Sequence, residues 1–229
     1  MHPCPLVYAH RGASRRAREN TVESFELATK IGADGVELDV WKSLDGELMV
    51  HHDSSVRGLL IERARAEDLP DYVPTLSEAL DACFGLKVNI EIKAAPENSR
   101  RALEIADALI DILRSRPEPA SQWIISSFEH GALDRIRNKS SNFYTGLLFW
   151  EESWSTVLRH AIENGHQALH PHETLVDDEM REATKNEDIH LNTWTVNNHL
   201  RVIELSELGV EGLITDVPDE VLKILQARA

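Results

Sequence analysis

The chain has 229 residues and a formal net charge of −15, with 42% hydrophobic and 28% charged residues. These proportions are ordinary for a soluble globular protein, and this length can bury a sizeable core in one or two domains. The negative charge argues against a broad nucleic-acid-binding surface, because a phosphate backbone needs a positive partner. An acidic chain that handles an anionic substrate would need a local positive centre, such as arginines or a bound cation.

Cysteine content and the first residues bear on the compartment. Cys4 and Cys83 are too few for a disulfide framework and lack metal-ligand spacing. The opening "MHPCPLVYAH" has no basic region followed by an apolar stretch, which argues against a signal peptide. No run approaches about 18 apolar residues, so no membrane span is expected. We therefore expect a cytoplasmic protein with reduced thiols.

Short β-rich segments alternate with helical patterns along the chain, which is typical of βαβ units. In chain order, the predicted strands cover residues 6–10, 35–40, 87–93, 123–128, 143–149, 167–172, 189–196 and 212–216. Helical periodicity lies between them, for example at 21–32, 75–85, 99–115 and 157–165. Eight such alternations predict a (β/α)8 TIM barrel formed by a single domain over residues 1–229. The alternative, a doubly wound open sheet, usually has a GxGxxG turn after its first strand, and "HRGASRR" lacks that spacing.

In a barrel, chemistry takes place at the carboxyl ends of the strands, and polar residues gather at those positions here. They are His10, Arg11, Glu37, Asp39, Glu91, Lys93, His170, His172, Trp194, Asn197, Thr215 and Asp216. A purely structural barrel would not need charged pairs at so many strand ends. The sequence therefore predicts an active site at this mouth of the barrel.

Glu37 and Asp39 are two residues apart on a predicted strand, so their side chains share one face. The alternating apolar residues suit the helix-facing side, which leaves both carboxylates pointing into the barrel. Two such carboxylates repel each other unless a proton or cation lies between them, and a hard divalent ion fits. On the next strand, Glu91 offers a third carboxylate and Lys93 a cation for a phosphate. The alternative for that pair is a buried ion pair without a ligand.

The dipeptide Asp45-Gly46, between alternating apolar residues, predicts a β-hairpin with a two-residue turn. Such a turn places Asp39 opposite His52, on the same side of the ribbon. His51 then points the other way, so this register selects His52 as the functional imidazole. A single bulge would reverse the choice.

Together, these predictions gather two histidines, three carboxylates, an arginine and a lysine at one mouth. Two imidazoles can act as base and acid in one turnover, because they titrate near neutral pH. A hard cation polarises phosphoryl oxygens, and positive groups beside it stabilise an anionic phosphorus centre. The set fits a metal-dependent phosphodiesterase better than a carboxylate–metal aldolase or isomerase, which needs fewer cations.

The stretch "AHRGASRRARENTVESFELATKIGADGVELDVWKSLDGELMVHHD" closely resembles the N-terminal signature of glycerophosphodiester phosphodiesterases. The segments "VPTLSEAL", "NIEIK", "ISSF", "TWTVN" and "GLITDVP" follow in matching order. The resemblance implies a TIM barrel that uses one Mg²⁺ or Ca²⁺ ion to hydrolyse glycerophosphodiesters to sn-glycerol 3-phosphate and an alcohol. The matching positions are His10 and His52 for general base and general acid, Glu37, Asp39 and Glu91 for the metal, Arg11 and Lys93 for the phosphate, and Trp194 for an apolar wall against the substrate.

Two departures from the family pattern stand out. The usual Pro-Glu-Asn-Thr reads "RENT", with Arg18 in place of proline. Glu19 can still brace the site, and Asn20 or Thr21 can cap the first helix. Many members carry a long insertion after the His-Asp pair, whereas only a short one, at about 54–74, is present here. This difference predicts a more open substrate site.

Other interpretations stay open. A lysophospholipase D-like enzyme of the same superfamily would call for an exposed apolar segment near the mouth, for which "RGLLIERARAEDL" is the only candidate. A non-catalytic phosphoester-binding barrel would lack a histidine or carboxylate, and none is missing. The arginines of "SRRAR" form either a solvated loop or an anion funnel. The preferred alcohol and a possible homodimer are left undecided by the sequence.

Two further groups of side chains have a structural interpretation. His170 and His172 are two apart on a strand. One is expected to line the pocket and the other to lie at the surface or to support a pocket residue, rather than both binding a second metal. Trp123, Trp150 and Trp154 are expected to be packing residues.

Overall fold

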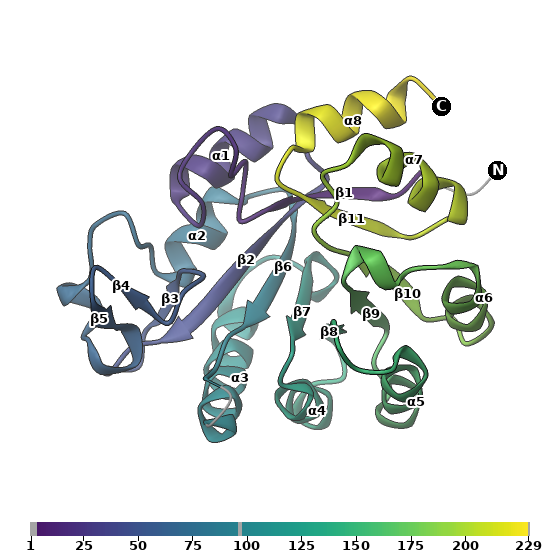
Figure 1. The fold of residues 1–229 in the computed structure, drawn as a ribbon. Coiled ribbons are helices and arrows are strands. Elements are labelled where there is room, and N and C mark those ends of the chain that lie inside the picture. Colours follow the sequence, from purple (N-terminus) through teal and green to yellow (C-terminus); the bar gives the residue numbers. More distant parts are fainter. Residues whose placement is uncertain (1–3, 96–97, 229) are drawn as a thin grey trace.

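The computed structural model describes residues 4–95 and 98–228, and eight parallel strands close into a barrel (Figure 1). In order around the barrel, these are β1 (Leu6–His10), β2 (Gly35–Lys42), β6 (Lys87–Ile92), β7 (Trp123–Ser127), β8 (Tyr144–Phe149), β9 (Ala168–Pro171), β10 (His190–Thr193) and β11 (Gly212–Thr215). β1 pairs with both β2 and β11, and this pairing closes the eight strands into a ring. The predicted (β/α)8 TIM barrel is confirmed.

Helices surround the barrel on its outer side (Figure 1). They are α1 (Val22–Ile31), α2 (Leu76–Ala82), α3 (Ser99–Ser115), α4 (His130–Lys139), α5 (Trp154–Asn164), α6 (Asp178–Asn186), α7 (His199–Leu208) and α8 (Pro218–Gln226), with short 3₁₀ turns η3 (Ala120–Gln122) and η4 (Glu173–Leu175). Two predicted helices begin at capping boxes: Thr21 accepts from Ser24 N at α1, and Thr75 from Glu78 N at α2. Gly32 ends α1 in the left-handed conformation, which glycine adopts without steric strain because it has no Cβ.

The interior of the barrel is filled by large side chains that lie against glycines. A Cβ on Gly146 would lie 2.3 Å from Nε2 of His170, and one on Gly212 would lie 2.3 Å from Oδ1 of Asn192. His170 is fully buried and accepts a hydrogen bond from Asn192 Nδ2 at 3.0 Å. Burial lowers the pKa of His170 to about 3, so this imidazole is neutral. His170 is therefore a packing residue of the barrel interior, not a pocket or surface residue as one of the sequence interpretations allowed.

The hairpin after β2 has a different register from the predicted one. β3 (Leu48–Val50) runs antiparallel to β2 with Val50 opposite Val40. Ser43 N donates to Glu47 O just beyond the two strands, so the loop proper has three residues, 44–46, and ends at Gly46 with φ +100°. A three-residue loop of this kind places a glycine in the left-handed region, whereas the prediction used a two-residue turn. The extra residue moves the partner of Asp39 from His52 to His51, whose main-chain N–H donates to Asp39 O.

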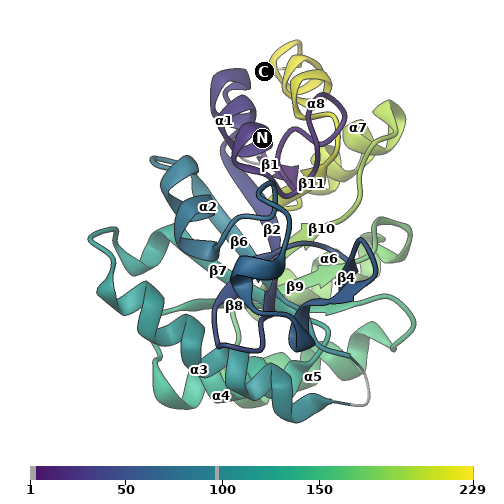
Figure 2. The ribbon, with the colours of Figure 1, turned by 90° about the vertical axis from the view of Figure 1, so that its left-hand side faces the viewer.

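The segment between β3 and α2 packs on the outer strands as a small unit of its own. It contains β4 (Ser55–Val56), β5 (Leu59–Leu60), η1 (Ile61–Arg63) and η2 (Ala66–Asp68). Its apolar side chains join Trp41 and Met49 in a satellite cluster separate from the main core. Figure 2 looks toward the end of the barrel at which β2 finishes, with this segment in front of the ring of strands and helices. The segment therefore lies at the mouth that the sequence assigns to the chemistry.

Candidate active site

Three carboxylates project into the mouth of the barrel because the parallel register aligns them. His10 is paired with Glu37 across β1 and β2, and Asp39 is paired with Glu91 across β2 and β6. The three carboxylates are buried, with exposures of 3%, 1% and 9% for Glu37, Asp39 and Glu91. One oxygen from each lies within 4.8 Å of the others. The period-2 argument from the sequence therefore placed these side chains on the correct face.

Lys93 lies next to this cluster. Its Nζ is 2.7 Å from Glu91 Oε1 and 3.3 Å from Asp39 Oδ1, so the ion pair that the sequence left as an alternative is present. Burial raises the pKa of Asp39, but Lys93 and Arg11 outweigh it, and the net shift is downward. Burial raises the pKa of Glu91 despite Lys93. Lys93 thus compensates part of the negative charge of Asp39 and Glu91.

Glu37 is the least compensated member of the cluster. Burial, followed by repulsion from Asp39, raises the pKa of its carboxyl group. Its Oε2 accepts a hydrogen bond from Arg11 N at 3.0 Å, but its buried Oε1 has no hydrogen-bond partner among the described residues. A buried carboxylate oxygen without a partner costs free energy unless a cation approaches it. Three converging carboxylates with such an oxygen fit a hard divalent cation.

His10 is oriented by residues from the other end of the chain. Its Nδ1–H donates to Asp216 Oδ1 at 2.6 Å, and Asn197 Nδ2 donates to Asp216 Oδ2 at 2.7 Å. The opposite ring nitrogen, Nε2, is 3.9 Å from Glu37 Oε2. Burial lowers the pKa of His10, but Asp216 and Glu37 outweigh it and raise the pKa overall. The imidazole therefore has one nitrogen held in place and the other directed at the carboxylates.

Arg11 follows β1 with a positive φ of 56°, which turns its side chain back across the mouth. Its Nη1 donates to both carboxylate oxygens of Glu19 at 3.1 Å, and its Nε lies 3.5 Å from Asp39 Oδ2. Glu19 thus braces the guanidinium. Asn20 does not cap the helix: its Nδ2 donates to Asp39 Oδ2 at 2.7 Å, while Thr21 is the N-cap.

His52 lies where the chain bends after β3. Its Nδ1–H donates to Asp53 Oδ1 at 2.9 Å, and its carbonyl accepts from Trp41 Nε1. Burial lowers the pKa of His52, and Lys93 also lowers it against the opposing effect of Asp39. The structure therefore brings His52 into the field of the charged cluster, although the register used to select it was wrong. β3 ends at residue 50, so the alternation of side chains along a strand no longer applies at His52. The bend in the chain after β3 sets the direction of its side chain instead.

The family comparison agrees with this architecture. The model described as "Glycerophosphoryl diester phosphodiesterase family" matches residues 10–220. The chain belongs to this family.

Among named relatives, the glycerophosphodiester phosphodiesterase of Caldanaerobacter subterraneus subsp. tengcongensis is 30% identical, with 96% of this chain and 98% of that protein covered. The Bacillus subtilis protein of the same name is 28% identical, with 96% and 86% covered. The solved glycerophosphodiester phosphodiesterase of Thermotoga maritima is 28% identical with a TM-score of 0.83, covering 98% of this chain and all of that one. The present protein is thus an enzyme that hydrolyses glycerophosphodiesters.

A fourth related protein supports the fold. A phosphodiesterase of Oleispira antarctica, solved in complex with the product sn-glycerol-3-phosphate, gives a TM-score of 0.86 at 24% identity, with 97% of each chain covered. No helix among the described residues of the present phosphodiesterase combines the length and apolar character needed to cross a bilayer.

Aromatic side chains form a surface on one side of the phosphodiesterase mouth. They follow four consecutive strands and are Phe128, Trp150, His172 and Trp194. The Trp194 ring meets Phe128 edge-on at 5.6 Å and His172 at 5.2 Å, and Trp150 stacks on His172 at 4.4 Å. Trp150 is 54% exposed, so its expected role in packing was wrong, whereas Trp123 is fully buried as expected. His172 takes part in this stack.

Sequence reasoning left some neighbours of the phosphodiesterase site without a role. Asp216 and Asn197 appeared only as polar strand ends, and the pair Asn20–Asp39 was not foreseen. Of the arginines in "SRRAR", Arg16 pairs with Asp219, and Arg18 lies 4.0 Å from the Tyr72 ring centroid in the short insertion. Arg18, in place of the family's proline, thus links the first loop to that insertion.

Proposed function

We propose that this enzyme hydrolyses glycerophosphodiesters to sn-glycerol 3-phosphate and an alcohol, using one Mg²⁺ or Ca²⁺ ion and two histidines. The observation that carries the proposal is the cluster of three buried carboxylates, with an unpartnered Glu37 oxygen, beside two imidazoles and two cationic side chains. A water-soluble glycerophosphodiester in the cytoplasm is the substrate class that we propose.

The cation would be held by Glu37, Asp39 and Glu91. When bound, it would polarise a phosphoryl oxygen and lower the pKa of a nearby hydroxyl group. The carboxylates also hold Arg11 and Lys93 in place, because each of these two charged side chains contacts at least one carboxylate. Positive groups kept in fixed positions stabilise a developing anionic charge without reorganising. We assign the substrate phosphate to these two side chains.

His10 and His52 would divide the two proton transfers, one from the attacking hydroxyl and one to the leaving alcohol. Asp216 holds Nδ1 of His10, so Nε2 is the atom that exchanges the proton. Asp53 holds Nδ1 of His52 in the same way, which leaves its Nε2 for the transfer. Trp194, in the aromatic surface, would form the apolar wall against the glycerol or alcohol moiety.

Phosphorus NMR tests this proposal directly. The purified protein is incubated with glycerophosphocholine, glycerophosphoethanolamine or lysophosphatidylcholine, each with Mg²⁺, Ca²⁺ or EDTA. We expect metal-dependent growth of glycerol 3-phosphate from the first two substrates and none in EDTA. Equal turnover in EDTA would contradict the metal site, and a folded protein without turnover of any substrate would support a non-catalytic phosphoester-binding barrel instead.

A second candidate function has one observation in its favour. Leu59 and Leu60, in the short segment at the mouth, are 43% and 39% exposed. Exposed leucines beside Arg57 and Arg63 suit a lipid surface, as a lysophospholipase D-like enzyme would need. Turnover of lysophosphatidylcholine alone, or release of a cyclic phosphate, in the same NMR experiment would favour this candidate.

A further inference from the structure

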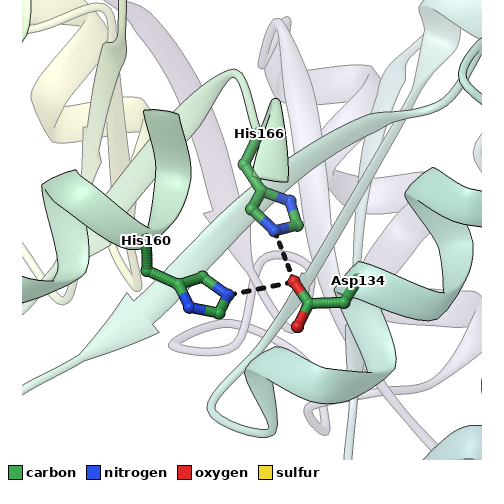
Figure 3. A group of neighbouring side chains, drawn as sticks. All are labelled: Asp134, His160 and His166. Atoms are coloured by element: carbon green, nitrogen blue, oxygen red, sulfur yellow. Dashed lines mark hydrogen bonds and ion pairs between the residues drawn. The ribbon is translucent and has the colours of Figure 1, made fainter. Parts of the chain in front are cut away.

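Two histidines and an aspartate converge on the outer side of the barrel, between α4 and α5 (Figure 3). Asp134 lies on α4, His160 lies on α5, and His166 follows the glycine that ends α5. Nε2 of each imidazole lies 2.9 Å from Asp134 Oδ1. Gly165 has a φ of +73°, which turns the chain sharply after α5.

Polar groups behind His166 hold its imidazole in place. Gln167 Oε1 accepts from Thr145 N at 3.0 Å, and Gln167 Nε2 donates to Gly165 O at 3.0 Å, so the amide orientation is set. Thr145 Oγ1 lies 3.2 Å from the same Oε1 and 2.9 Å from Nδ1 of His166. The hydroxyl oxygen can therefore accept from Nδ1–H, which leaves Nε2 available to a metal ion.

Nε2 of His166 and Nε2 of His160 both face Asp134 Oδ1, so two imidazole nitrogens and a carboxylate oxygen converge within 4.8 Å. The His166 side chain has 0% exposure, so its ring is held in this direction by the packing around it. A single metal ion could bind all three atoms. Metal-bound histidines usually donate their second N–H to an acceptor, which is the role of Thr145 here.

We propose that Asp134, His160 and His166 form a second metal site, for a divalent transition-metal ion with zinc as the best match. Two imidazoles and one carboxylate are zinc donors, whereas Mg²⁺ and Ca²⁺ prefer oxygen ligands. Ligands of a tetrahedral zinc ion lie roughly 3.3 Å apart, given metal–ligand distances of about 2.0–2.1 Å. Small side-chain adjustments reach this spacing from 2.9 Å.

The surroundings of the cluster leave room for an ion to enter and for solvent to complete its ligands. The side chains of His160 and Asp134 are 34% and 28% exposed. The bound ion would join α4 to α5 and to the start of β9, next to His166. It would therefore be a structural link in the helical layer, chemically distinct from the all-carboxylate cluster at the mouth.

Zinc binding by the full-length protein tests the site, with Mg²⁺ in excess to occupy the carboxylate cluster. We compare the wild type with His160→Gln by equilibrium dialysis and by thermal melting. The matched control is His199→Gln, because His199 Nε2 also pairs with a carboxylate, Glu220, at 2.7 Å, and no second imidazole joins this pair within the described part of the chain. We expect His160→Gln to weaken zinc binding at least about tenfold and to lose the zinc-dependent rise in Tm, while the control keeps both.

A second variant separates this site from the active centre. Glu37→Gln removes a carboxylate of the mouth cluster, so the zinc equivalent assigned to the outer site is expected to remain. Co²⁺ in place of zinc adds a visible absorption band that reports imidazole ligation even if a variant changes stability. Equal zinc affinity in the wild type and His160→Gln would overturn the proposal. Loss of the zinc equivalent in Glu37→Gln with retention in His160→Gln would assign it to the mouth instead.

Discussion

The mouth of the barrel and its helical layer each gather charged and imidazole side chains, but they do so by different means. At the mouth, Glu37, Asp39 and Glu91 come from neighbouring strands whose parallel register aligns them. In the helical layer, Asp134 meets histidines 26 and 32 residues away because α4 and α5 both lie on β8 and a glycine turn follows α5. Strand pairing aligns carboxylate oxygens in a buried site. The outer helices bring a carboxylate oxygen and two imidazole nitrogens together in a partly exposed site. The two regions should therefore respond differently to metals and to substitution.

The largest expected difference concerns the two clusters themselves. Glu37→Gln should lower kcat/KM by roughly 10³-fold or more, because the cation supplies several kcal/mol of transition-state stabilisation. His160→Gln, in the outer cluster, should leave kcat/KM with the Mg²⁺-loaded enzyme unchanged. Steady-state hydrolysis of glycerophosphocholine across Mg²⁺ concentrations measures both. Glu26→Gln, an exposed residue of α1, controls for loss of a surface carboxylate, and near-wild-type activity of Glu37→Gln would refute the mouth assignment.

A second test compares neighbouring histidines at the mouth. His52→Gln should reduce kcat by roughly 10²–10⁴-fold, the usual contribution of general acid–base catalysis. His51→Gln is the matched control and should retain most of the activity, because the His51 side chain hydrogen-bonds the Asp53 carbonyl and, among the described residues, no group of the charged cluster. His10→Gln should match the loss in His52→Gln. If His51→Gln were the inactive variant, the side-chain direction set by the bend after β3 would be misassigned.

A third test compares the tolerance of the barrel interior and of the helical layer. Gly146→Ala should destabilise the protein by about 1–3 kcal/mol, because the new Cβ would lie 2.3 Å from His170. A Cβ at Gly131 in α4 would meet no atom of the described residues within 4 Å, so Gly131→Ala should be neutral or stabilising by up to about 1 kcal/mol. Urea unfolding followed by circular dichroism gives both values. Equal effects at the two positions would show that the interior is not closely packed around His170.

The smallest expected effect on stability concerns the contact of α4 with α3. There, Asp107 of α3 pairs with Arg135 and Lys139 of α4. Hydrogen bonds, chiefly from Arg135, lower the pKa of Asp107 from 3.8 to about 2. Its contribution to stability is therefore present above pH 3.8 and is lost as the pH falls toward 2. Because the pair is partly exposed, Asp107→Asn should cost less than about 1 kcal/mol near neutral pH.

Thermal melting between pH 2 and pH 7 measures this pH dependence. Asp111→Asn, on the same helix, serves as the control for a surface aspartate. The difference between wild type and Asp107→Asn should shrink as the pH falls below 3.8. A difference that is constant over this range would mean that the ion pairs do not stabilise the α3–α4 contact.

The sequence could predict those parts of the site that depend on local periodicity. Alternation along "GVELDV" and "NIEIK" places Glu37, Asp39 and Glu91 on interior faces, and eight strand–helix repeats determine the closed barrel. The direction of His52 was predicted from a turn type, and that step failed. Asp-Gly is compatible with either a two-residue or a three-residue loop, and the choice depends on how the hairpin packs with the segment that follows.

What the sequence determined by itself is therefore the fold, the mouth carboxylates and the family to which the chain belongs. Only the tertiary structure decided which residues meet across long separations. Asp216 reaches His10 from 206 residues away because the last strand closes the barrel against the first. Asp134, His160 and His166 meet because α4 and α5 both cover β8 on the outside of the barrel, and no local spacing encodes that contact. Period and propensity act within a few residues, whereas such clusters depend on how whole elements pack.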